Sequence, residues 1–578
     1  MNNIMACREQ MLSNDYMEIT LDYIAPVGLV TAPGSCYEVI DEQFVVLLVD
    51  RNLVSTISIS ELTYTAVPKL YGLMQVEASP GEAVFDPLSL IRSGILQVQR
   101  APLSLTGRGV VLGFVDTGIR YDLDVFRRPD GTSRILAIWD QTIQDGEPPE
   151  GFSYGTLYTN EQINEALQSD DPLSIVPSTD TDGHGTAMAS VAAGSTVNFG
   201  LSFIGAAPDA DIVMVKCREA KPYLRDYYFI PEGVPAYSGT DIGMAVKYLE
   251  NFTEIGSRPV VISIGMGSNM GDHAGNSILS RYLNRVAEKR NRTVIICGGN
   301  EGNAGHHFSS LITMSARLVV ETVEMRVDAG EVGFLVELWG APPNVLSVAI
   351  RSPGGEVIPA IDYRSKTTRN FSFIYERTRV TVDHLLVEER TGEQVVVFRF
   401  EDPTPGVWTF NIVVEGDSDY SEINMWLPIT DFLVGDTRFL RSTPYTTLTE
   451  PSLARFTITP STYDDTNDSF FIESGRGFSR AAETKPDFAA PGVNVSTALG
   501  DRTGASISAA ITAGAAAQFM QWAVVQNNVP LANTNQVKSY FIRGARRDVE
   551  VVYPNRSWGY GQLDIERTFR IIAGTIGG

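Results

Sequence analysis

The stretch VVLGFVDTG at residues 110–118 decides the fold class of this chain. Its first six residues form an apolar run rich in β-branched side chains, which is typical of a strand buried on both faces of a parallel sheet. Asp116 comes where that strand ends. Because open α/β sheets bind their ligands at the carboxyl ends of strands, Asp116 is a candidate for chemistry, although aspartate is also common in ordinary turns.

A histidine follows in the stretch DGHGT at residues 182–186. His184 lies between two glycines, which let backbone and substrate approach closely, and it precedes small residues that favour a helix. At the N-terminus of that helix, the dipole would lower the pKa of the imidazole and keep it neutral, as a general base requires. The alternative is a core or surface histidine without a catalytic role.

The third stretch, GASISAA at residues 504–510, opens an alanine-rich segment that predicts a buried helix. Ser506 would stand at its N-terminus, where backbone N–H groups point at the charge that develops on a substrate. A serine at that place can also be an ordinary N-cap. Ser508 is a competing candidate, which we assign to helix packing.

A fourth stretch, TVIICGGNEGN at residues 293–303, predicts a strand that ends in glycines and an asparagine. The side-chain amide of Asn300 can donate a hydrogen bond to an oxyanion. The alternative for Asn300 is a turn residue, since asparagine is common in turns.

Taken in this order, the four stretches resemble the subtilase family of serine proteases, whose chain order is Asp, His, Ser. KPDFAAPG at residues 485–492 resembles the family's segment before the nucleophile. The resemblance implies that Asp116 orients the base, His184 is the base, Ser506 attacks, and Asn300 forms the oxyanion hole with the Ser506 N–H. Ala505 replaces the family's usual threonine, a side chain that takes no part in the chemistry.

Two further stretches narrow the resemblance. RILAIWDQTI at residues 134–143 and NEGNAGHH at residues 300–307 look like the Csp proteases of clostridial spore germination. Those are subtilases that keep their prodomain and carry an inserted jelly roll. The resemblance therefore implies a serine endopeptidase that processes itself and cleaves a protein substrate, such as a proenzyme in spore germination.

The expected fold is α/β: a subtilisin-like parallel sheet with helices on both faces, an N-terminal α/β prodomain and an inserted all-β jelly roll. We expect the prodomain at residues 1–75, the catalytic domain at residues 76–308 and 450–578, and the insertion at residues 309–449. Short alternating runs between prolines and glycines predict the strands of the insertion. They are 318–327, 332–339, 346–351, 378–387, 395–400 and 407–414. We favour a rigid brace over a binding function for this insertion.

The N-terminal part predicts a strand over residues 41–49 and a second apolar run from Leu53 to Ile57. PKLYGLMQ at residues 68–75 resembles the end of a subtilase prodomain, which lies in the substrate cleft after self-cleavage. We predict autoprocessing after Gln75, with Gln97 and Gln99 as weaker alternatives. An N-terminal domain that is never cleaved is the competing interpretation.

VVISIGMG at residues 260–267 looks like the strand along which subtilases bind an extended substrate. Ser263, Gly265 and Gly267 are therefore the candidate substrate-binding residues. The adjacent His306 and His307 lack a third ligand nearby, so we predict no metal site, and we expect no cofactor.

The amino-acid composition limits the kinds of partner that the protein can bind. With 45 basic and 69 acidic residues, the net charge of −24 disfavours nucleic acid and anionic membranes. No apolar run is long enough to span a membrane, and the first residues lack the layout of a signal peptide. Four scattered cysteines are too sparse for a disulfide framework. We expect a monomer that is synthesised in the cytoplasm and is spore-associated or released.

Two other classes of function remain as alternatives. A pseudoprotease could act as a signalling scaffold, and a jelly roll could be the active part of a binding protein. The complete set of Asp116, His184 and Ser506 favours the protease.

Overall fold

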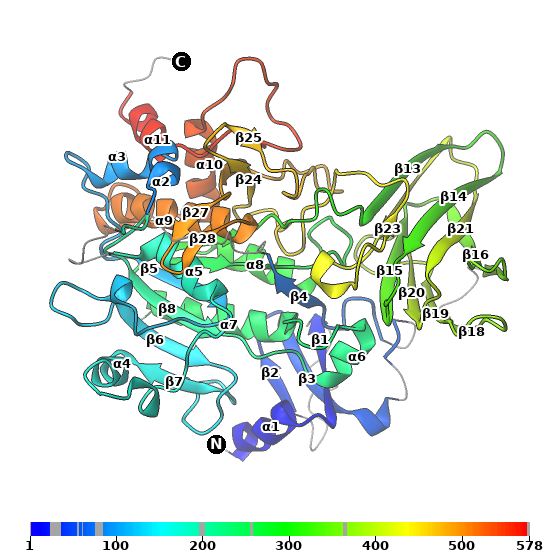
Figure 1. Cartoon of the computed structure of the whole chain (residues 1–578), viewed down its shortest axis with the longest axis horizontal. Coiled ribbons are helices and arrows are strands. Elements are labelled where there is room, and N and C mark those ends of the chain that lie inside the picture. The colour runs from blue at the N-terminus through cyan, green and yellow to red at the C-terminus, as the bar shows by residue number, and fades with distance from the viewer. Residues whose placement is uncertain are drawn as a thin grey trace.

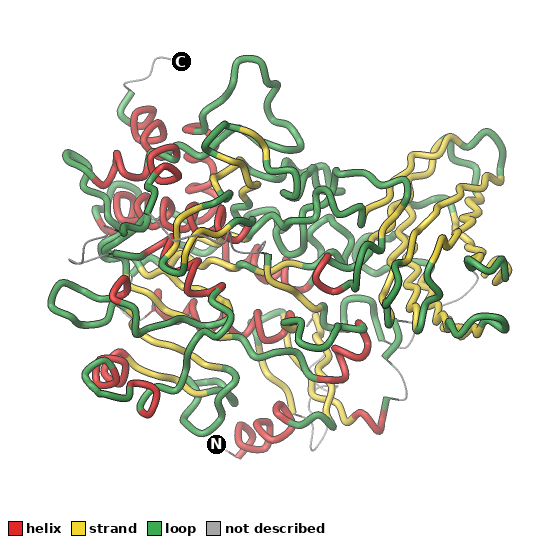
Figure 2. The backbone as a smooth tube through the Cα atoms, viewed as in Figure 1, coloured by secondary structure: helices red, strands yellow, loops and turns green. Residues whose placement is uncertain are grey.

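The computed structural model describes residues 2–22, 36–54, 57–59, 62–74, 85–195, 203–254, 258–361 and 367–574. It has three parts: an α/β unit with a six-stranded sheet, a small N-terminal unit below it in the view, and an inserted antiparallel β unit to the right (Figure 1). Most helices gather in the α/β unit, whereas the insertion consists of strands and loops (Figure 2).

The central sheet confirms the strand expected from the opening stretch. Its order is β12-β10-β5-β8-β6-β7, and all neighbours are parallel except β7, which is antiparallel to β6. The strands are β5 (Val111–Asp116), β6 (Ile135–Asp140), β7 (Thr156–Thr159), β8 (Asp211–Lys216), β10 (Val260–Ile264) and β12 (Arg292–Ile296). Every residue of β5 is buried, because helices cover both faces of the sheet.

Alternate residues of β5 enter two different cores. Leu112 and Phe114 pack with α5 (His184–Ala193) and α9 (Ala505–Met520), while Val111 and Val115 pack with α7 (Gly239–Glu254) and α8 (Ile278–Glu288). This arrangement places the carboxyl end of β5 beside the first residues of α5 and brings the start of α9 to the same region. The sheet therefore gathers three of the predicted site segments.

All residues of α5 and α9 are buried, and the small residues of both helices allow this close packing. A Cβ on Gly514 of α9 would lie 2.2 Å from the Ala206 Cβ.

The other helices are α2 (Leu88–Arg92), α3 (Ile95–Gln99), α4 (Asn160–Ala166), α6 (Pro222–Tyr228), α10 (Thr534–Gly544) and α11 (Ile565–Ile572). No helix among the described residues has both the length and the apolar character that crossing a membrane requires.

Short strands complete the α/β unit, and single helical turns occur in all three parts. The strands are β24 (Pro460–Asp464), β25 (Ser469–Phe470), β26 (Phe488–Pro491), β27 (Val495–Thr497) and β28 (Gly500–Arg502). Single turns of 3₁₀ helix occur at Arg51–Leu53, Asp124–Phe126, Pro172–Ser174 and Thr430–Phe432, and a π-helical turn at Gln521–Val525 follows α9.

The N-terminal unit is an antiparallel sheet with one helix. Its elements are α1 (Asn2–Leu12), β1 (Tyr16–Asp22), β2 (Cys36–Val39) and β3 (Phe44–Asp50), and the strand order is β1-β3-β2. The strand predicted over residues 41–49 is confirmed as β3. Leu53, the first residue of the second predicted run, instead ends a 3₁₀ turn that Asp50 caps, and residues 55–56 of that run lie outside the described residues.

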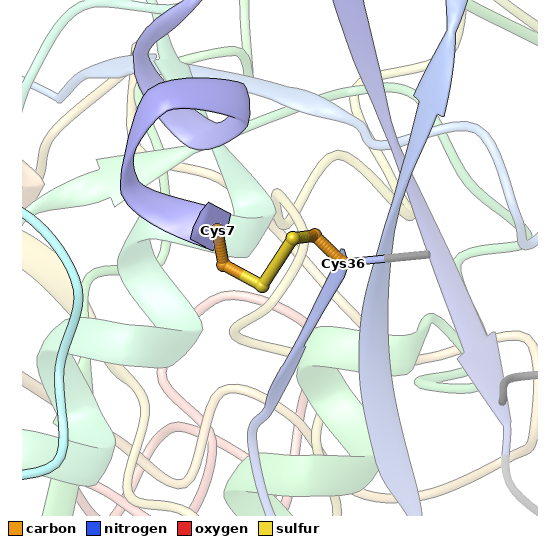
Figure 3. Close-up of a disulfide and its surroundings, with 2 residues drawn as sticks. All are labelled: Cys7 and Cys36. Atoms are coloured by element: carbon orange, nitrogen blue, oxygen red, sulfur yellow. A yellow bond between two sulfur atoms is a disulfide. The ribbon is translucent and has the colours of Figure 1, made fainter. Parts of the chain in front are cut away.

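A disulfide joins Cys7 of α1 to Cys36 of β2 (Figure 3). This single disulfide was not expected from the sequence, which predicted only that four scattered cysteines form no disulfide framework. The pairing could not be read from the spacing, because the two residues meet only once α1 has packed against β2. Cys217 and Cys297 are buried free thiols.

The insertion is a sandwich of two antiparallel sheets. The first has the order β13-β22-β15-β20-β19-β18 and the second β17-β16-β21-β14-β23, and their facing side chains form one core. The strands are β13 (His307–Thr313), β14 (Leu318–Val327), β15 (Gly333–Gly340), β16 (Val345–Arg351), β17 (Val357–Ile361), β18 (Thr367–Ser372), β19 (Arg379–Leu385), β20 (Gln394–Glu401), β21 (Gly406–Glu415), β22 (Tyr420–Trp426) and β23 (Arg438–Phe439). All six predicted strands are present, and β14 has the predicted bounds.

One strand connects the N-terminal unit to the α/β unit. β4 (Leu70–Leu73) ends the N-terminal unit and lies between β9 (Tyr237–Ser238) and β11 (Met266–Gly267) of the α/β unit, antiparallel to both. Figure 1 shows this blue strand among the green elements at the centre of the molecule.

Candidate active site

Asp116 and His184 are in direct contact. Asp116 is the last residue of β5 and His184 the first of α5, and the Asp116 Oδ1 lies 2.7 Å from the His184 Nδ1. Both side chains are buried. Gly183, with φ of +93°, supplies the left-handed turn from which α5 starts. The predicted pair is therefore assembled with Nδ1 engaged and the other ring nitrogen directed elsewhere.

The electrostatics of His184 differ from the expectation based on the helix dipole. Burial lowers the pKa of His184, but the Asp116 carboxylate in contact with the ring, together with Asp182 and Asp180, outweighs burial, and the net shift is upward from 6.5. The expected downward shift is corrected, because three nearby carboxylates favour the charged imidazole.

Ser506 is the second residue of α9, after Gly504, whose φ is +147°. Its Oγ and the His184 Nε2 are buried, and neither has a hydrogen-bond partner among the described residues. Ser508 differs, because its hydroxyl lies 3.0 Å from the Thr462 Oγ1 and 3.1 Å from each of two main-chain carbonyl oxygens. Ser506 therefore has the free hydroxyl, and Ser508 has a structural one.

Asn300 lies directly beside the start of α9. Its Oδ1 accepts a hydrogen bond of 3.0 Å from the Ala505 N–H. This contact fixes the amide plane and leaves the Asn300 Nδ2 available as a donor. The arrangement suits an oxyanion hole that combines Nδ2 with the neighbouring Ser506 N–H.

The end of the N-terminal unit lies along the substrate cleft expected beside these residues. The Met74 carbonyl oxygen accepts a hydrogen bond of 3.2 Å from the Ser506 N–H, and the Met74 N–H donates to the Gly265 carbonyl at 3.0 Å. Two residues earlier, Gly72 pairs with Gly267 across β4 and β11. The tail therefore lies as an extended segment, with one carbonyl oxygen against the first N–H groups of α9.

Of the three residues predicted to bind substrate, two contact this tail. Gly265 and Gly267 do so through their main chains. Gly265 also borders the catalytic pair, because a Cβ there would lie 2.7 Å from the His184 Cε1. Ser263 instead lies inside β10, paired with Phe114 on one side and Ile295 on the other, so its main chain is already bonded within the sheet.

Comparison with known families agrees with this geometry. Residues 107–561 match the peptidase S8 family model, described as the Subtilase family. The chain belongs to the subtilase family. It is therefore a serine protease by family, and the matched region includes the insertion.

Several solved structures are similar to this subtilase. The CspB protease of Clostridium perfringens is 28% identical, with a TM-score of 0.73, and the match covers 84% of this chain and 98% of that one. The epidermin leader peptide processing protease EpiP of Staphylococcus aureus is 11% identical, with a TM-score of 0.47 over 98% of this chain and 100% of that one. MycP1 of Mycobacterium smegmatis is 14% identical, with a TM-score of 0.37 over 86% and 88%. The search of curated proteins found no match.

Asp180 is a site residue of the subtilase that the sequence reasoning missed. Its Oδ1 accepts hydrogen bonds from the Thr117 hydroxyl at 2.9 Å and the Gly183 N–H at 2.8 Å. Its Oδ2 accepts from the Thr186 N–H at 2.9 Å and hydroxyl at 2.6 Å. Asp180 thus ties the loop after Asp116 to the residues that flank His184. An aspartate shortly before a helix start was the available signal.

The remaining candidates of the subtilase lie as follows. His306 contacts the Glu301 carboxylate, and His307 lies between the Tyr445 carbonyl and Asn424, so the two rings have separate protein partners. The described part of the chain contains no group of three or more His, Cys, Asp or Glu side chains suited to a metal ion. Gln75 lies outside the described residues.

The two alternative processing positions are placed by the structure. Gln97 and Gln99 belong to α3, and Gln99 donates to the carbonyls of Gly205 and Ala206. A helix cannot pair along the cleft as β4 does, so neither position is presented to Ser506 in this structure.

Proposed function

We propose that this subtilase is an endopeptidase whose first substrate is its own chain, cut at the end of the N-terminal unit. In this proposal residues 1–75 are the prodomain, residues 76–308 and 450–578 the catalytic domain, and residues 309–449 the inserted domain. The observation that carries the proposal is the hydrogen bond from the Ser506 N–H to the Met74 carbonyl oxygen. A carbonyl held by that N–H is placed as the carbonyl of a substrate would be.

The mechanism follows from the atoms around that carbonyl. The Ser506 Oγ attacks the carbonyl carbon while the His184 Nε2 takes its proton, and Asp116 stabilises the imidazolium through Nδ1. Negative charge on the carbonyl oxygen is stabilised by the Ser506 N–H and the Asn300 Nδ2. His184 then returns the proton to the leaving amine, which breaks the C–N bond. Water hydrolyses the acyl-enzyme, with His184 again acting as base.

Ion pairs support retention of the prodomain after cleavage. Glu18 is buried, and its carboxylate accepts from Arg218 at 2.8 Å and from Thr240 at 2.5 Å, with Lys221 at 3.5 Å. Burial alone would raise the pKa of Glu18, but Arg218 and Lys221 outweigh it and the pKa is lowered. Asp22 pairs with Arg281 at 2.5 Å. A prodomain held this way keeps its tail in the cleft and blocks other substrates.

The insertion contributes to the same retention. Glu337 of β15 is buried and accepts hydrogen bonds from the Tyr64 hydroxyl at 2.6 Å and Lys69 at 3.3 Å, both in the N-terminal unit. It also accepts from the Gly271 N–H of the catalytic unit at 3.1 Å. One carboxylate therefore joins all three parts, which supports the role of the insertion as a brace.

The physiological role rests on resemblance. Likeness to the Csp proteases, including 28% identity to CspB, supports cleavage of a proenzyme during spore germination. We accordingly propose an enzyme that is spore-associated or released, and that acts on a protein once its own cleft has been cleared.

Intact-mass analysis of the wild type, Ser506→Ala and Ser309→Ala tests the proposal. Ser309 is an exposed serine of β13 and serves as the control. We expect two fragments from the wild type and Ser309→Ala, and one full-length chain from Ser506→Ala. The scale of the rate loss, up to about 10⁶-fold, is taken from subtilisin.

Full-length chains from all three variants, with no labelling by a fluorophosphonate probe, would favour a scaffold. Fragments from Ser506→Ala would remove Ser506 from the mechanism.

A further inference from the structure

We propose that the self-processing bond is Met74–Gln75, one residue before the bond chosen from the sequence, and that the pocket beside Ser506 selects an unbranched apolar side chain of the length of methionine. The inference rests on the proposed self-processing and names its bond and its substrate class. It follows from the register of the tail and from the packing around the Met74 side chain.

The register places Met74 at the reacting position. The carbonyl next to the nucleophile's N–H is the one that Ser506 attacks, and this carbonyl belongs to Met74. On the other side of the same residue, the Met74 N–H donates to Gly265. Leu73 then pairs with Met266, and Gly72 with Gly267. Both hydrogen-bonding groups of Met74 are engaged, so the acyl group formed on Ser506 ends in Met74.

Gly72 fixes this register independently. A Cβ at Gly72 would lie 2.4 Å from the Ile429 Cδ1 and 3.2 Å from the Phe432 Cε1, and both of those side chains are buried. Cleavage after Gln75 requires the tail to slip by one residue, which would put Leu73 at this crowded position. A one-residue slip also turns every side chain of the strand to its opposite face. Gly72 therefore lies at a position where Ile429 and Phe432 leave no room for a side chain.

The side chain of Met74 is buried. A Cβ on Gly267 would lie 3.3 Å from the Met74 Cε and 2.3 Å from the Thr449 Oγ1, so the Met74 methyl and Thr449 lie side by side. A Cβ on Gly299 would lie 2.6 Å from the Thr449 Cγ2. Thr449 thus fills the space between two glycines and limits the depth of the pocket.

This packing defines the substrate class. Methionine fits because its chain is unbranched and its thioether is apolar, whereas a phenylalanine ring would meet Thr449. Glutamine has the same length, so size alone does not separate Met74 from Gln75, and the main-chain register decides between them. Protein substrates of this subtilase should therefore carry methionine, or a residue of its length, at the bond that is cut.

The mass of the released N-terminal fragment is the direct test. We expect the wild-type fragment to end in Met74 and the remainder to begin at Gln75. N-terminal glutamine cyclises readily with loss of ammonia, so the fragment that ends in Met74 is the safer readout. A fragment ending in Gln75 overturns this inference and leaves self-processing intact, whereas a wild type that never cleaves overturns both.

A matched pair of variants tests the pocket. Met74→Phe should slow self-processing by about 10–200-fold, the range for a misfit in an apolar pocket, while Gln75→Phe should change it by less than about threefold. Thr449→Ala added to Met74→Phe should restore at least about tenfold. The inference is overturned if Met74→Phe and Gln75→Phe slow self-processing equally, or if Gln75→Phe slows it more.

The folding control places each substitution in the Ser506→Ala chain. Unchanged Tm there shows that a slow variant is folded.

Discussion

The N-terminal unit meets the catalytic unit in two regions that are built differently. At the cleft, the tail is held by main-chain groups, as in the hydrogen bonds of Met74 with Gly265 and Ser506. Away from the cleft, the body of the unit is held by buried side chains, as in the pair of Glu18 with Arg218. Main-chain contacts accept any extended segment, whereas paired side chains recognise one partner.

This difference separates two properties of the enzyme. In the proposed function, cutting depends on groups that surround one carbonyl, and these are Ser506, His184 and Asn300. Retention depends on charges far from that carbonyl. Substitutions in one region should therefore change one property and leave the other, and the predictions below test that separation.

Glu18→Ala should give the largest effect, and it should change only the retention of the cleaved N-terminal fragment. It leaves Arg218 and Lys221 buried with one carboxylate fewer, and removing one partner of a buried ion pair costs about 3–5 kcal/mol. Self-processing should proceed, but the fragment should separate from the catalytic domain on size-exclusion chromatography. The exposed Asp15 of the same unit provides the control variant, Asp15→Ala, which should stay bound. Equal retention of both variants would contradict the role of Glu18.

Asn300→Ala should give the next largest effect, and on cutting alone. It removes one donor to the oxyanion, which costs about 2.7–4 kcal/mol on the scale measured for the equivalent donor in subtilisin. Cleavage should slow by about 10²–10³-fold in a time course followed by mass spectrometry. Asn303→Ala, an exposed asparagine of the same loop, should cleave normally. A normal rate for Asn300→Ala would remove it from the site.

The same contrast explains what the sequence predicted well. Asp116, His184 and Ser506 stand at a strand end and at two helix starts, which are local features that a short motif reports. The strands of the insertion were predictable for the same reason, because alternation of apolar and polar residues over β14 is visible without a partner.

What the sequence did not predict depends on residues far apart in the chain. Glu18 and Arg218, or Glu337 and Lys69, are paired only by the folded topology. The register that places Met74 at Ser506 is also set by tertiary packing, through the side chains that crowd Gly72. The upward pKa shift of His184 depends on a 2.7 Å contact that composition cannot report.

The pH dependence should report on the catalytic region. His184 must be neutral to accept the proton, and its pKa is raised above 6.5 because Asp116, together with Asp182 and Asp180, outweighs burial. Self-processing should therefore be fast above that raised pKa and fall by about tenfold for each pH unit below it. Wild type recovered uncleaved from inclusion bodies in denaturant and then diluted into buffers across this range, with cleavage followed by mass, gives the profile. A midpoint below 6.5 would contradict the dominance of Asp116.

Arg285→Ala should give the smallest effect, and it decides how the retention contacts are ranked. Arg285 contacts Asp41 of the N-terminal unit at 2.7 Å, but its side chain is 37% exposed, whereas Arg218 is 10% exposed. An exposed pair contributes about 0.2–1 kcal/mol and is screened by salt. The fragment should therefore stay bound to Arg285→Ala at low and high salt. Release as complete as with Glu18→Ala would contradict this ranking, because the exposed pair would then contribute as much to retention as the buried pair.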